Sequence, residues 1–138
     1  MIGFSGKRPS TIGPKAGLLR PCPGTPNCVC SHDQGRDGIP PLTFTDSKEA
    51  ALQRLEKVLL SMDGCRLITR SDKYLHAEFR TRWLGFVDDF EAVIQVAPAE
   101  STAMGELHVR SASRLGHSDF GVNRKRVERI RTQFNQNP

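Results

Sequence analysis

The second half of the chain alternates between apolar and polar residues with a period of two, the pattern of half-buried β-strands. We expect strands over residues 65–70, 74–81, 86–97 and 105–112, and a shorter first strand over 41–45. The polar turn 71–73, the short connection 83–85 and the loop 98–103 would join the four longer strands. Consecutive strands with short connections predict an antiparallel meander.

Two segments instead repeat apolar residues at helical spacing. The stripe of the first helix consists of Ala51, Leu55, Val58, Leu59 and Met62. Asp46 is expected to cap this helix, with Glu49 in the capping-box position and Gly64 after its end. The second helix is expected over about residues 122–135. Its stripe consists of Val127, Ile130 and Phe134.

These elements predict an α+β fold of two layers, in which an antiparallel sheet of four to five strands carries both main helices on one face. Residues 1–41 break the pattern, because prolines recur there and exclude a long helix or a central strand. We expect an irregular Pro/Gly-rich arm that lies extended over the domain, or disorder in the first ~15 residues. Residues 42–138 would form the α+β domain, and the two parts a single structural unit.

Charge is distributed unevenly along the chain, which carries a net charge of +5. Residues 1–40 sum to +3, residues 41–109 to −3 and residues 110–138 to +5. Internal ion pairing explains this layout and is favoured; the alternative is a surface that binds phosphate, nucleic acid or acidic lipid. Aromatic residues do not interleave with basic ones, so a nucleic-acid partner is not expected.

The strand 86–97 places carboxylates on both of its faces. Asp88 shares a face with Phe90 and other apolar residues, so it needs a partner. Asp89 and Glu91 fall on the opposite, outward face. If strands 86–97 and 105–112 form a hairpin, Glu91 faces Arg110, and a cross-strand ion pair is expected.

The last helix begins with Arg124, Lys125 and Arg126, where the helix macrodipole disfavours cations. In the favoured explanation Asp119 caps the helix, and the carboxylates of the strand 86–97 supply compensating charge. The candidate structural ion-pair residues are Asp88, Asp89, Glu91 and Asp119. The alternative is an external anion, bound by helix amides and arginine side chains. The candidate ligand-binding residues are Arg110, Ser111, Ser113, Arg114, Asn123, Arg124 and Arg126.

Catalytic patterns are sparse. The chain contains no GxSxG, GxxxxGK[ST] or HExxH motif. Asp88, Glu91 and His117 have the residue types of a hydrolase-like enzyme, and they are the weak catalytic candidates. The leading prediction is a non-enzymatic binding module whose Asp/Glu–Arg polar site takes a small anion or a protein partner. We expect no cofactor.

A cysteine cluster lies in the arm, with Cys22, Cys28, Cys30 and His32 close together in sequence. These residues could bind zinc, but the second knuckle of structural zinc sites is missing, so no metal is expected. A Cys22–Cys28 disulfide would imply an oxidising compartment. Reduced thiols are favoured, and a thiol or metal site at Cys22 and Cys28 stays an alternative function.

Two observations bear on location. No apolar run approaches the roughly 20 residues that a membrane span requires, so no transmembrane segment is expected. The first residues are basic but include no apolar stretch typical of a signal peptide. A cytoplasmic location is therefore expected.

Four blocks of the chain carry a resemblance to a known family: FSGKRPSTIGPKAGLLRPCPGTPNC, YLHAEF, GFVDDFE and VRSASRLGHSDFGVNRKRVERIR. Together they resemble the domain-of-unknown-function family DUF1499 of bacterial and plastid proteins, over almost the whole chain. GFVDD and RSASR-x-G-x-SD-x-GVNRKR are specific in combination. The family has no established biochemical activity, so the resemblance implies motif positions rather than a reaction.

The resemblance places motif positions in the arm, in the strand 86–97 and around the last helix. They are Cys22, Pro26, Asn27, Cys28, Asp88, Asp89, Glu91, Arg110, Ser111, Ser113, Arg114, Asp119, Gly121, Asn123, Arg124 and Arg126. The family pattern reads Ser where this chain has Cys30, which weakens the zinc hypothesis. Some relatives resemble exported or membrane-attached proteins, but this chain lacks their leader.

Overall fold

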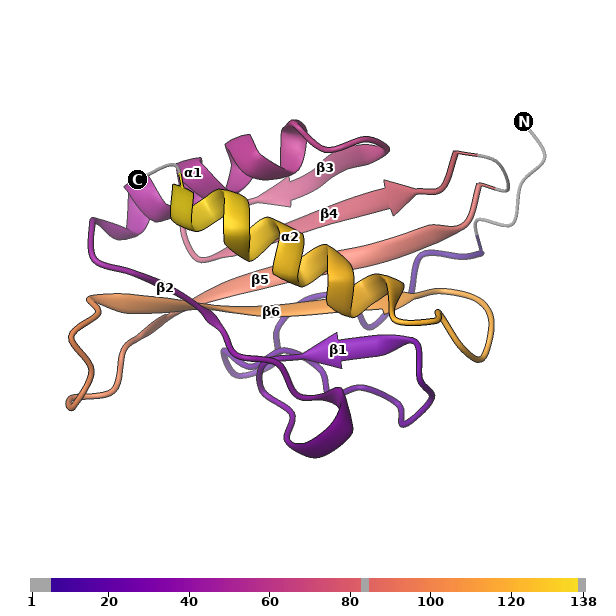
Figure 1. The fold of residues 1–138 in the computed structure, drawn as a ribbon, viewed down its shortest axis with the longest axis horizontal. Coiled ribbons are helices and arrows are strands. Elements are labelled where there is room, and N and C mark those ends of the chain that lie inside the picture. Colours follow the sequence, from indigo (N-terminus) through magenta and orange to yellow (C-terminus); the bar gives the residue numbers. More distant parts are fainter. Residues whose placement is uncertain (1–5, 83–84, 137–138) are drawn as a thin grey trace.

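The computed structural model describes residues 6–82 and 85–136, which form two helices and a six-stranded antiparallel sheet (Figure 1). The strands are β1 (Cys28–Cys30), β2 (Leu42–Phe44), β3 (Cys65–Arg70), β4 (Tyr74–Arg80), β5 (Val87–Val96) and β6 (Gly105–Ser113). The helices are α1 (Lys48–Leu60) and α2 (Val122–Gln136), and a short 3-10 helix, η1, covers Gly35–Asp37. The predicted α+β class is confirmed. Trp83 and Leu84 of the expected connection lie outside the described residues.

The sheet has the strand order β1-β6-β5-β4-β3, and β2 also pairs with β6. The predicted meander of four consecutive strands is therefore confirmed as β3 to β6. The expected four to five strands were too few, because β6 is long enough to take two partners along one edge. β2 pairs with residues 105–107 and β1 with residues 110–112. A three-residue strand is too short to show a period, so the arm was wrongly expected to be irregular at Cys28–Cys30.

Both helices cover one face of the sheet, and α2 lies in front of it in Figure 1. Their apolar stripes pack on the residues of β4, β5 and β6 that point toward them, including Phe90, Leu107 and Val109. The predicted stripe of α2 is confirmed, because Val127, Ile130 and Phe134 are all buried. Neither helix is long and apolar enough to span a bilayer, within the residues that the structure describes.

The cap of α1 lies one residue later than predicted. Ser47, not Asp46, is the N-cap, and its hydroxyl accepts a hydrogen bond from the amide of Ala50 at 3.1 Å. Asp46 instead forms an ion pair with Arg54. Both residue types cap helices well, so the sequence alone could not choose between neighbours.

The register of the β5–β6 hairpin is the predicted one, since Glu91 lies opposite Arg110. Asp88 points toward the helices, as expected from its parity, and Asp89 and Glu91 point to the other face. Solvent does not cover that face, because the arm runs over it. Glu91 is 1% exposed and Asp89 2% exposed. The prediction that this face is outward was therefore wrong.

Residues 6–21 donate hydrogen bonds to the carboxylates on the second face of the sheet. Arg8 donates from Nε to Glu78 at 2.7 Å, and the amide of Gly13 donates to Glu91 at 2.9 Å. Alternation along a strand shows which residues share a face, but it does not show what covers that face. Here an extended segment replaces water as the partner of the carboxylates.

Candidate functional site

The predicted site residues divide between the two faces of the sheet. Those on the helix side form the helix-side cluster: Asp88, Ser111, Ser113, Asn123 and Arg126. Those on the other side form, with Arg8, Arg20, Tyr74, His76 and Glu78, the arm-side cluster: Asp89, Glu91, Arg110 and Arg114. Arg124 and His117 belong to neither cluster. One continuous site made of all these residues does not exist.

Asn123 is the centre of the helix-side cluster and is fully buried. Its Nδ2 donates to Asp119 at 2.8 Å and to Ser113 at 2.9 Å. Its Oδ1 accepts from Ser111 at 2.7 Å and from Arg126 at 2.8 Å. The amide side chain therefore links the first turn of α2 to the end of β6, and all of its hydrogen-bond donors and acceptor positions are used.

The two charges of the helix-side cluster are matched. Arg126 Nη2 lies 2.8 Å from Asp88 Oδ2, and the guanidinium carbon also lies over the ring of Phe79, 4.7 Å from its centroid. Asp119 caps α2, as predicted, by accepting from the amides of Gly121 and Asn123. Burial opposes ionisation of Asp119, but these hydrogen bonds outweigh it and lower its pKa. The helix-side cluster is structural.

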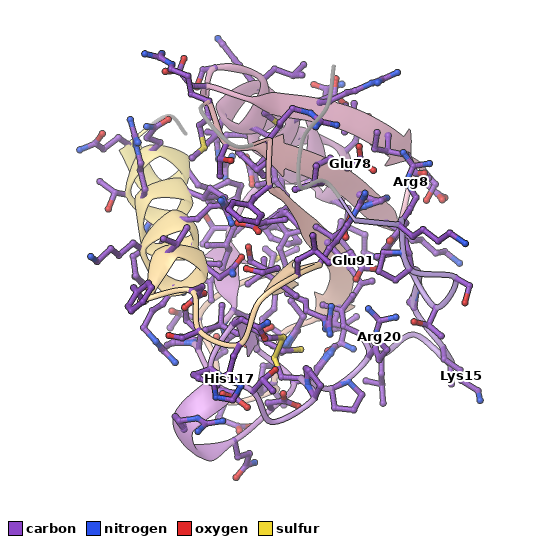
Figure 2. The ribbon with its side chains drawn as sticks, turned by 90° about the vertical axis from the view of Figure 1, so that its right-hand side faces the viewer. Arg8, Lys15, Arg20, Glu78, Glu91 and His117 are labelled. Carbon is purple, nitrogen blue, oxygen red and sulfur yellow. A yellow bond between two sulfur atoms is a disulfide. The ribbon has the colours of Figure 1, made fainter. Side chains whose placement is uncertain are left out.

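The arm-side cluster contains a second matched group. Arg114 holds both oxygens of Asp89 at 2.8 Å and also donates to Glu78, which Arg8 contacts from the arm (Figure 2). His76 Nε2 lies 2.8 Å from Asp89. Burial alone would raise the pKa of Asp89, but the hydrogen bonds from Arg114 and His76 outweigh burial and lower it. The same balance, with Arg8 and Arg114 as donors, lowers the pKa of Glu78.

Glu91 is satisfied mainly by neutral donors. Tyr74 donates its hydroxyl at 2.6 Å and Gly13 its amide at 2.9 Å to the same oxygen. Burial first, and the hydrogen bond to Glu91 second, raise the pKa of Tyr74, so its hydroxyl stays protonated. The predicted Glu91–Arg110 ion pair exists, but the two groups are 3.9 Å apart. Arg110 therefore gains little from its expected partner.

Arg110 is the least satisfied charge of the arm-side cluster. It is 4% exposed, its Nε has no hydrogen-bond partner among the described residues, and its Nη2 reaches only Pro21 O, at 3.5 Å. Burial first, and then the neighbouring Arg20, lower the pKa of Arg110. Arg20 Nη1 is likewise buried without a partner in the described part of the chain. Each of these two neighbouring guanidinium groups thus has a buried nitrogen without a hydrogen-bond partner among the described residues.

A cleft of about 420 Å³ opens beside these two arginines. Arg20, Pro21 and Pro23 of the arm form one wall, and Arg110, Ser113 and Arg114 at the end of β6 form the other. Asp89 also lines the cleft, although Arg114 already neutralises it. We call this space the arm-side cleft. It combines a concave shape with buried donors that lack acceptors.

The three catalytic candidates do not meet. Asp88 points to the helix side and Glu91 to the arm side of the sheet, whereas His117 lies on an exposed loop, away from Glu91 in Figure 2. The arm-side cleft contains none of them. An acid–base pair needs both groups within reach of one substrate, so the hydrolase-like arrangement fails on geometry.

The cysteines of the arm form a Cys22–Cys28 disulfide, so the expectation of reduced thiols was wrong for this pair. Cys30 and Cys65 are free thiols. The reason lies in the tertiary structure. The pairing of β1 with β6 holds Cys28 beside Cys22 of the arm, and the Cα atoms of the two cysteines are 5.6 Å apart, a distance that a disulfide can span.

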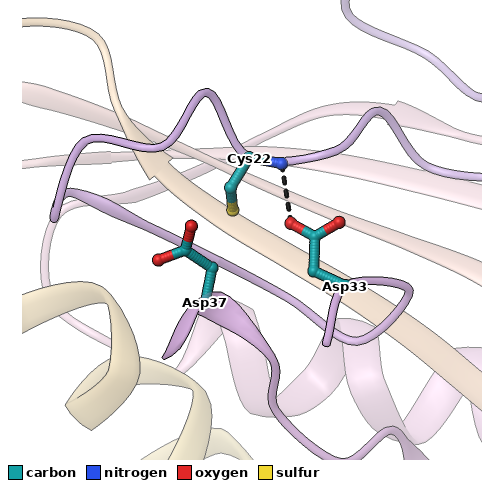
Figure 3. A group of neighbouring side chains, drawn as sticks. All are labelled: Cys22, Asp33 and Asp37. Carbon is teal, nitrogen blue, oxygen red and sulfur yellow. Dashed lines mark hydrogen bonds between the residues drawn. The ribbon is translucent and has the colours of Figure 1, made fainter. Parts of the chain in front are cut away.

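Among the residues that the structure describes, two groups of side chains have the proximity of metal ligands, and neither is the suggested set of Cys22, Cys28, Cys30 and His32. In the first, the carboxylates of Asp33 and Asp37 point toward Cys22, whose sulfur is already in the disulfide (Figure 3). The second consists of His76, Glu78 and Asp89, but arginine side chains occupy its carboxylates. A cation at either place would displace an existing bond.

The disulfide closes a short loop and should contribute measurably to stability. For the seven residues from Cys22 to Cys28, loop entropy gives about 2 kcal/mol. We expect a reducing agent to lower the free energy of unfolding by this amount in urea titrations. The Cys22→Ser/Cys28→Ser variant should have the lower value under both conditions; a change in its stability on reduction would contradict the assignment.

Arg8 and Arg20 were not recognised from the sequence, because arm residues carry no local pattern that predicts contact with the sheet. Tyr74 was missed because its contact with Glu91 depends on the pairing of β4 with β5. The regional charges were the available signal, with +3 in residues 1–40 against −3 in residues 41–109. Arg124, a predicted ligand residue, instead donates to the carbonyl of Arg36 at 2.6 Å and lies near Asp37 and Asp119 in a smaller cleft. Its observed hydrogen bond is therefore with a neutral backbone carbonyl.

Comparison with known proteins identifies the family. No curated protein matches this chain. The family model described as "Protein of unknown function (DUF1499)" matches residues 18–134, which are most of the chain. That match includes β1 to β6, α1, α2 up to residue 134, and Arg20, although not Arg8. The chain therefore belongs to the DUF1499 family of proteins of unknown function.

Proposed function

We propose that this protein is a non-enzymatic binding module that takes a small anion in the arm-side cleft, between Arg20 and Arg110. One observation carries the proposal: both guanidinium groups place a buried nitrogen without a hydrogen-bond partner beside the cleft. Buried donors that lack an acceptor cost about 1–3 kcal/mol each, and more when charged. An anion would remove both penalties at once.

The charge balance of the arm-side cluster supports an anion rather than a cation. Its positive groups are Arg8, Arg20, Arg110 and Arg114, and its carboxylates are Glu78, Asp89 and Glu91. Four guanidinium groups against three carboxylates leave one positive charge over. Arg54 and Arg70 also have an unsatisfied buried Nε, but each forms an ion pair with a carboxylate.

The lining residues suggest the class of ligand. Arginine binds planar carboxylate and tetrahedral phosphate or sulfate through two parallel N–H groups. The prolines of the arm supply apolar surface beside the arginines. A small carboxylate or phosphate compound fits this chemistry.

A thermal-shift series tests the site. Phosphate, sulfate and small carboxylates are titrated against the wild type and Arg20→Gln. A ligand at tenfold its Kd should stabilise the wild type by about 1.4 kcal/mol. The variant should lose this gain, yet unfold at the same temperature or higher without ligand, because repulsion between Arg20 and Arg110 is gone.

Lys15→Gln is the matched control, since it removes one exposed positive charge from the same arm. Its ligand-dependent gain should equal that of the wild type. If no anion stabilises the wild type, or if Arg20→Gln responds to anions as the wild type does, the site is not where we place it.

Location and domain organisation remain proposals as well. A cytoplasmic location stays a prediction, and the Cys22–Cys28 disulfide argues against it, because disulfides persist mainly in oxidising compartments. We propose that residues 1–41 and 42–138 act as one structural unit. The pairing of β1 with β6 and the arm-to-sheet hydrogen bonds support this arrangement.

A further inference from the structure

A second and larger cleft, of about 920 Å³, lies on the helix side of the molecule. It opens between the end of α1, the end of β4 and the first turns of α2, which gather at the same end of the molecule in Figure 1. Its charged lining residues are Asp63, Arg80, Arg82, Lys125, Arg126 and Arg129. Five cations against one carboxylate leave four positive charges. We call this space the basic cleft.

Most of these cations are not committed to the fold. Arg126 pairs with Asp88, and Arg80 donates to the carbonyl of Gly85 at 3.2 Å. The side chains of Lys125 and Arg129 have no hydrogen-bond or ion-pair partner within the described residues. Arg82 reaches Asp63 only at 3.5 Å, and both side chains are largely exposed. Lys125 and Arg126 also lie at the positive end of the α2 dipole. The basic cleft therefore favours a negative partner more strongly than an ordinary solvated face does.

Exposed apolar side chains adjoin the basic cleft. Val122 lines it and is 44% exposed. Phe120, two residues earlier, is 87% exposed and has a positive φ of 54°. A left-handed backbone is unfavourable at a bulky residue. A dissolved anion would explain the cations, but it would not explain an exposed aromatic ring two residues before Val122.

We propose that the basic cleft docks the protein on an anionic phospholipid surface. The headgroup phosphate would lie among Lys125, Arg129 and Arg82, while Phe120 and Val122 would enter the interface between headgroups and acyl chains. Cations beside an apolar patch are the combination that binds bilayer surfaces peripherally. The basic cleft is separate from the arm-side cleft and carries a function beyond small-anion binding.

Vesicle sedimentation tests this surface. The full chain should bind vesicles that contain phosphatidylglycerol and should not bind pure phosphatidylcholine, with binding weakened by salt. Lys125→Gln should weaken the vesicle partition coefficient about fivefold, because one cation at an anionic surface contributes about 1 kcal/mol. Lys15→Gln is the matched control: it also removes an exposed lysine, but on the side away from α2 (Figure 2). Its partition coefficient should not change.

Phe120→Gly separates a bilayer from a soluble ligand. Glycine suits the left-handed backbone, so this variant should fold at least as stably as the wild type. Its vesicle binding should fall about tenfold, the lower end of what burying a Phe side chain contributes. Glycerol phosphate in solution should compete only weakly.

Several results would overturn the lipid surface. These are equal binding to both kinds of vesicle, no binding to either, or the same loss for Lys125→Gln and Lys15→Gln. Full binding by Phe120→Gly together with strong competition by glycerol phosphate would instead identify a site for a soluble phosphate compound. The Arg20→Gln variant should bind vesicles like the wild type, so failure at one cleft does not imply failure at the other.

Discussion

Arg114→Met should lower the free energy of unfolding by about 3–5 kcal/mol, the cost of removing one partner from a buried ion pair. Arg114 holds both oxygens of Asp89 and also contacts Glu78. Without its guanidinium, two largely buried carboxylates lose their strongest donor. Denaturant titration at neutral pH, followed by circular dichroism, measures the change.

Two further variants make this test specific. Arg114→Lys should lose less than Arg114→Met but should not match the wild type, because an ammonium group cannot hold both oxygens of Asp89 in parallel. Adding Asp89→Asn to Arg114→Met should recover part of the loss by removing an uncompensated charge. A loss below about 1 kcal/mol for Arg114→Met would show that the pair behaves like an exposed one.

The pH dependence gives the same pair an independent signature. The pKa values of Asp89 and Glu78 are lowered in the folded state, so at acidic pH the folded state binds fewer protons than the unfolded state. Their stabilisation is present above the ordinary carboxyl pKa of about 4 and is lost as pH falls through the lowered values. The wild type should therefore lose stability on acidification, and Arg114→Met should lose less over the same range.

Asn123→Ala should cost about 3 kcal/mol, because it removes several buried hydrogen bonds worth about 1 kcal/mol each and leaves their partners unsatisfied. Asp119, Ser111 and Arg126 would each lose a partner. The damage should concentrate where α2 meets β6, so amides of the first turn of α2 should exchange faster with solvent.

Arg124→Ala is the control for the Asn123 variant. It changes the next residue of the same helix turn, but its side chain is exposed and makes one hydrogen bond, to the carbonyl of Arg36. Its cost should stay within about 1 kcal/mol, as for most exposed positions. Equal costs for the two variants would contradict the assignment of Asn123 as the centre of the helix-side cluster.

Local pattern was sufficient for the elements with a clear period. The meander β3 to β6, the facing of Glu91 and Arg110, and the buried stripe of α2 follow from alternation and helical spacing alone. The cap at Asp119 also follows, since an acidic residue before a helix that begins with cations has few other roles. These features depend on neighbours a few residues apart.

The charged residues at the basic start of α2 have different roles. Arg126 and Asp119 are structural, as the favoured explanation had it, and Arg124 donates a hydrogen bond to the carbonyl of Arg36 in the arm. The unsatisfied arginine is Arg110, whose predicted partner is 3.9 Å away. Strand register alone gives the facing pair, but it does not give the side-chain distance, which depends on what else donates to Glu91.

By itself, the sequence determined the α+β class, the order of the elements and the two faces of the central strands, because periodicity is a local property of the chain. Only the tertiary structure decided what covers those faces. The arm has no period, and its place on the sheet rests on contacts between residues 70 or more positions apart, such as Arg8 with Glu78 and Gly13 with Glu91. Those long-range contacts bury the carboxylates, form the disulfide and leave Arg20 and Arg110 beside an open cleft.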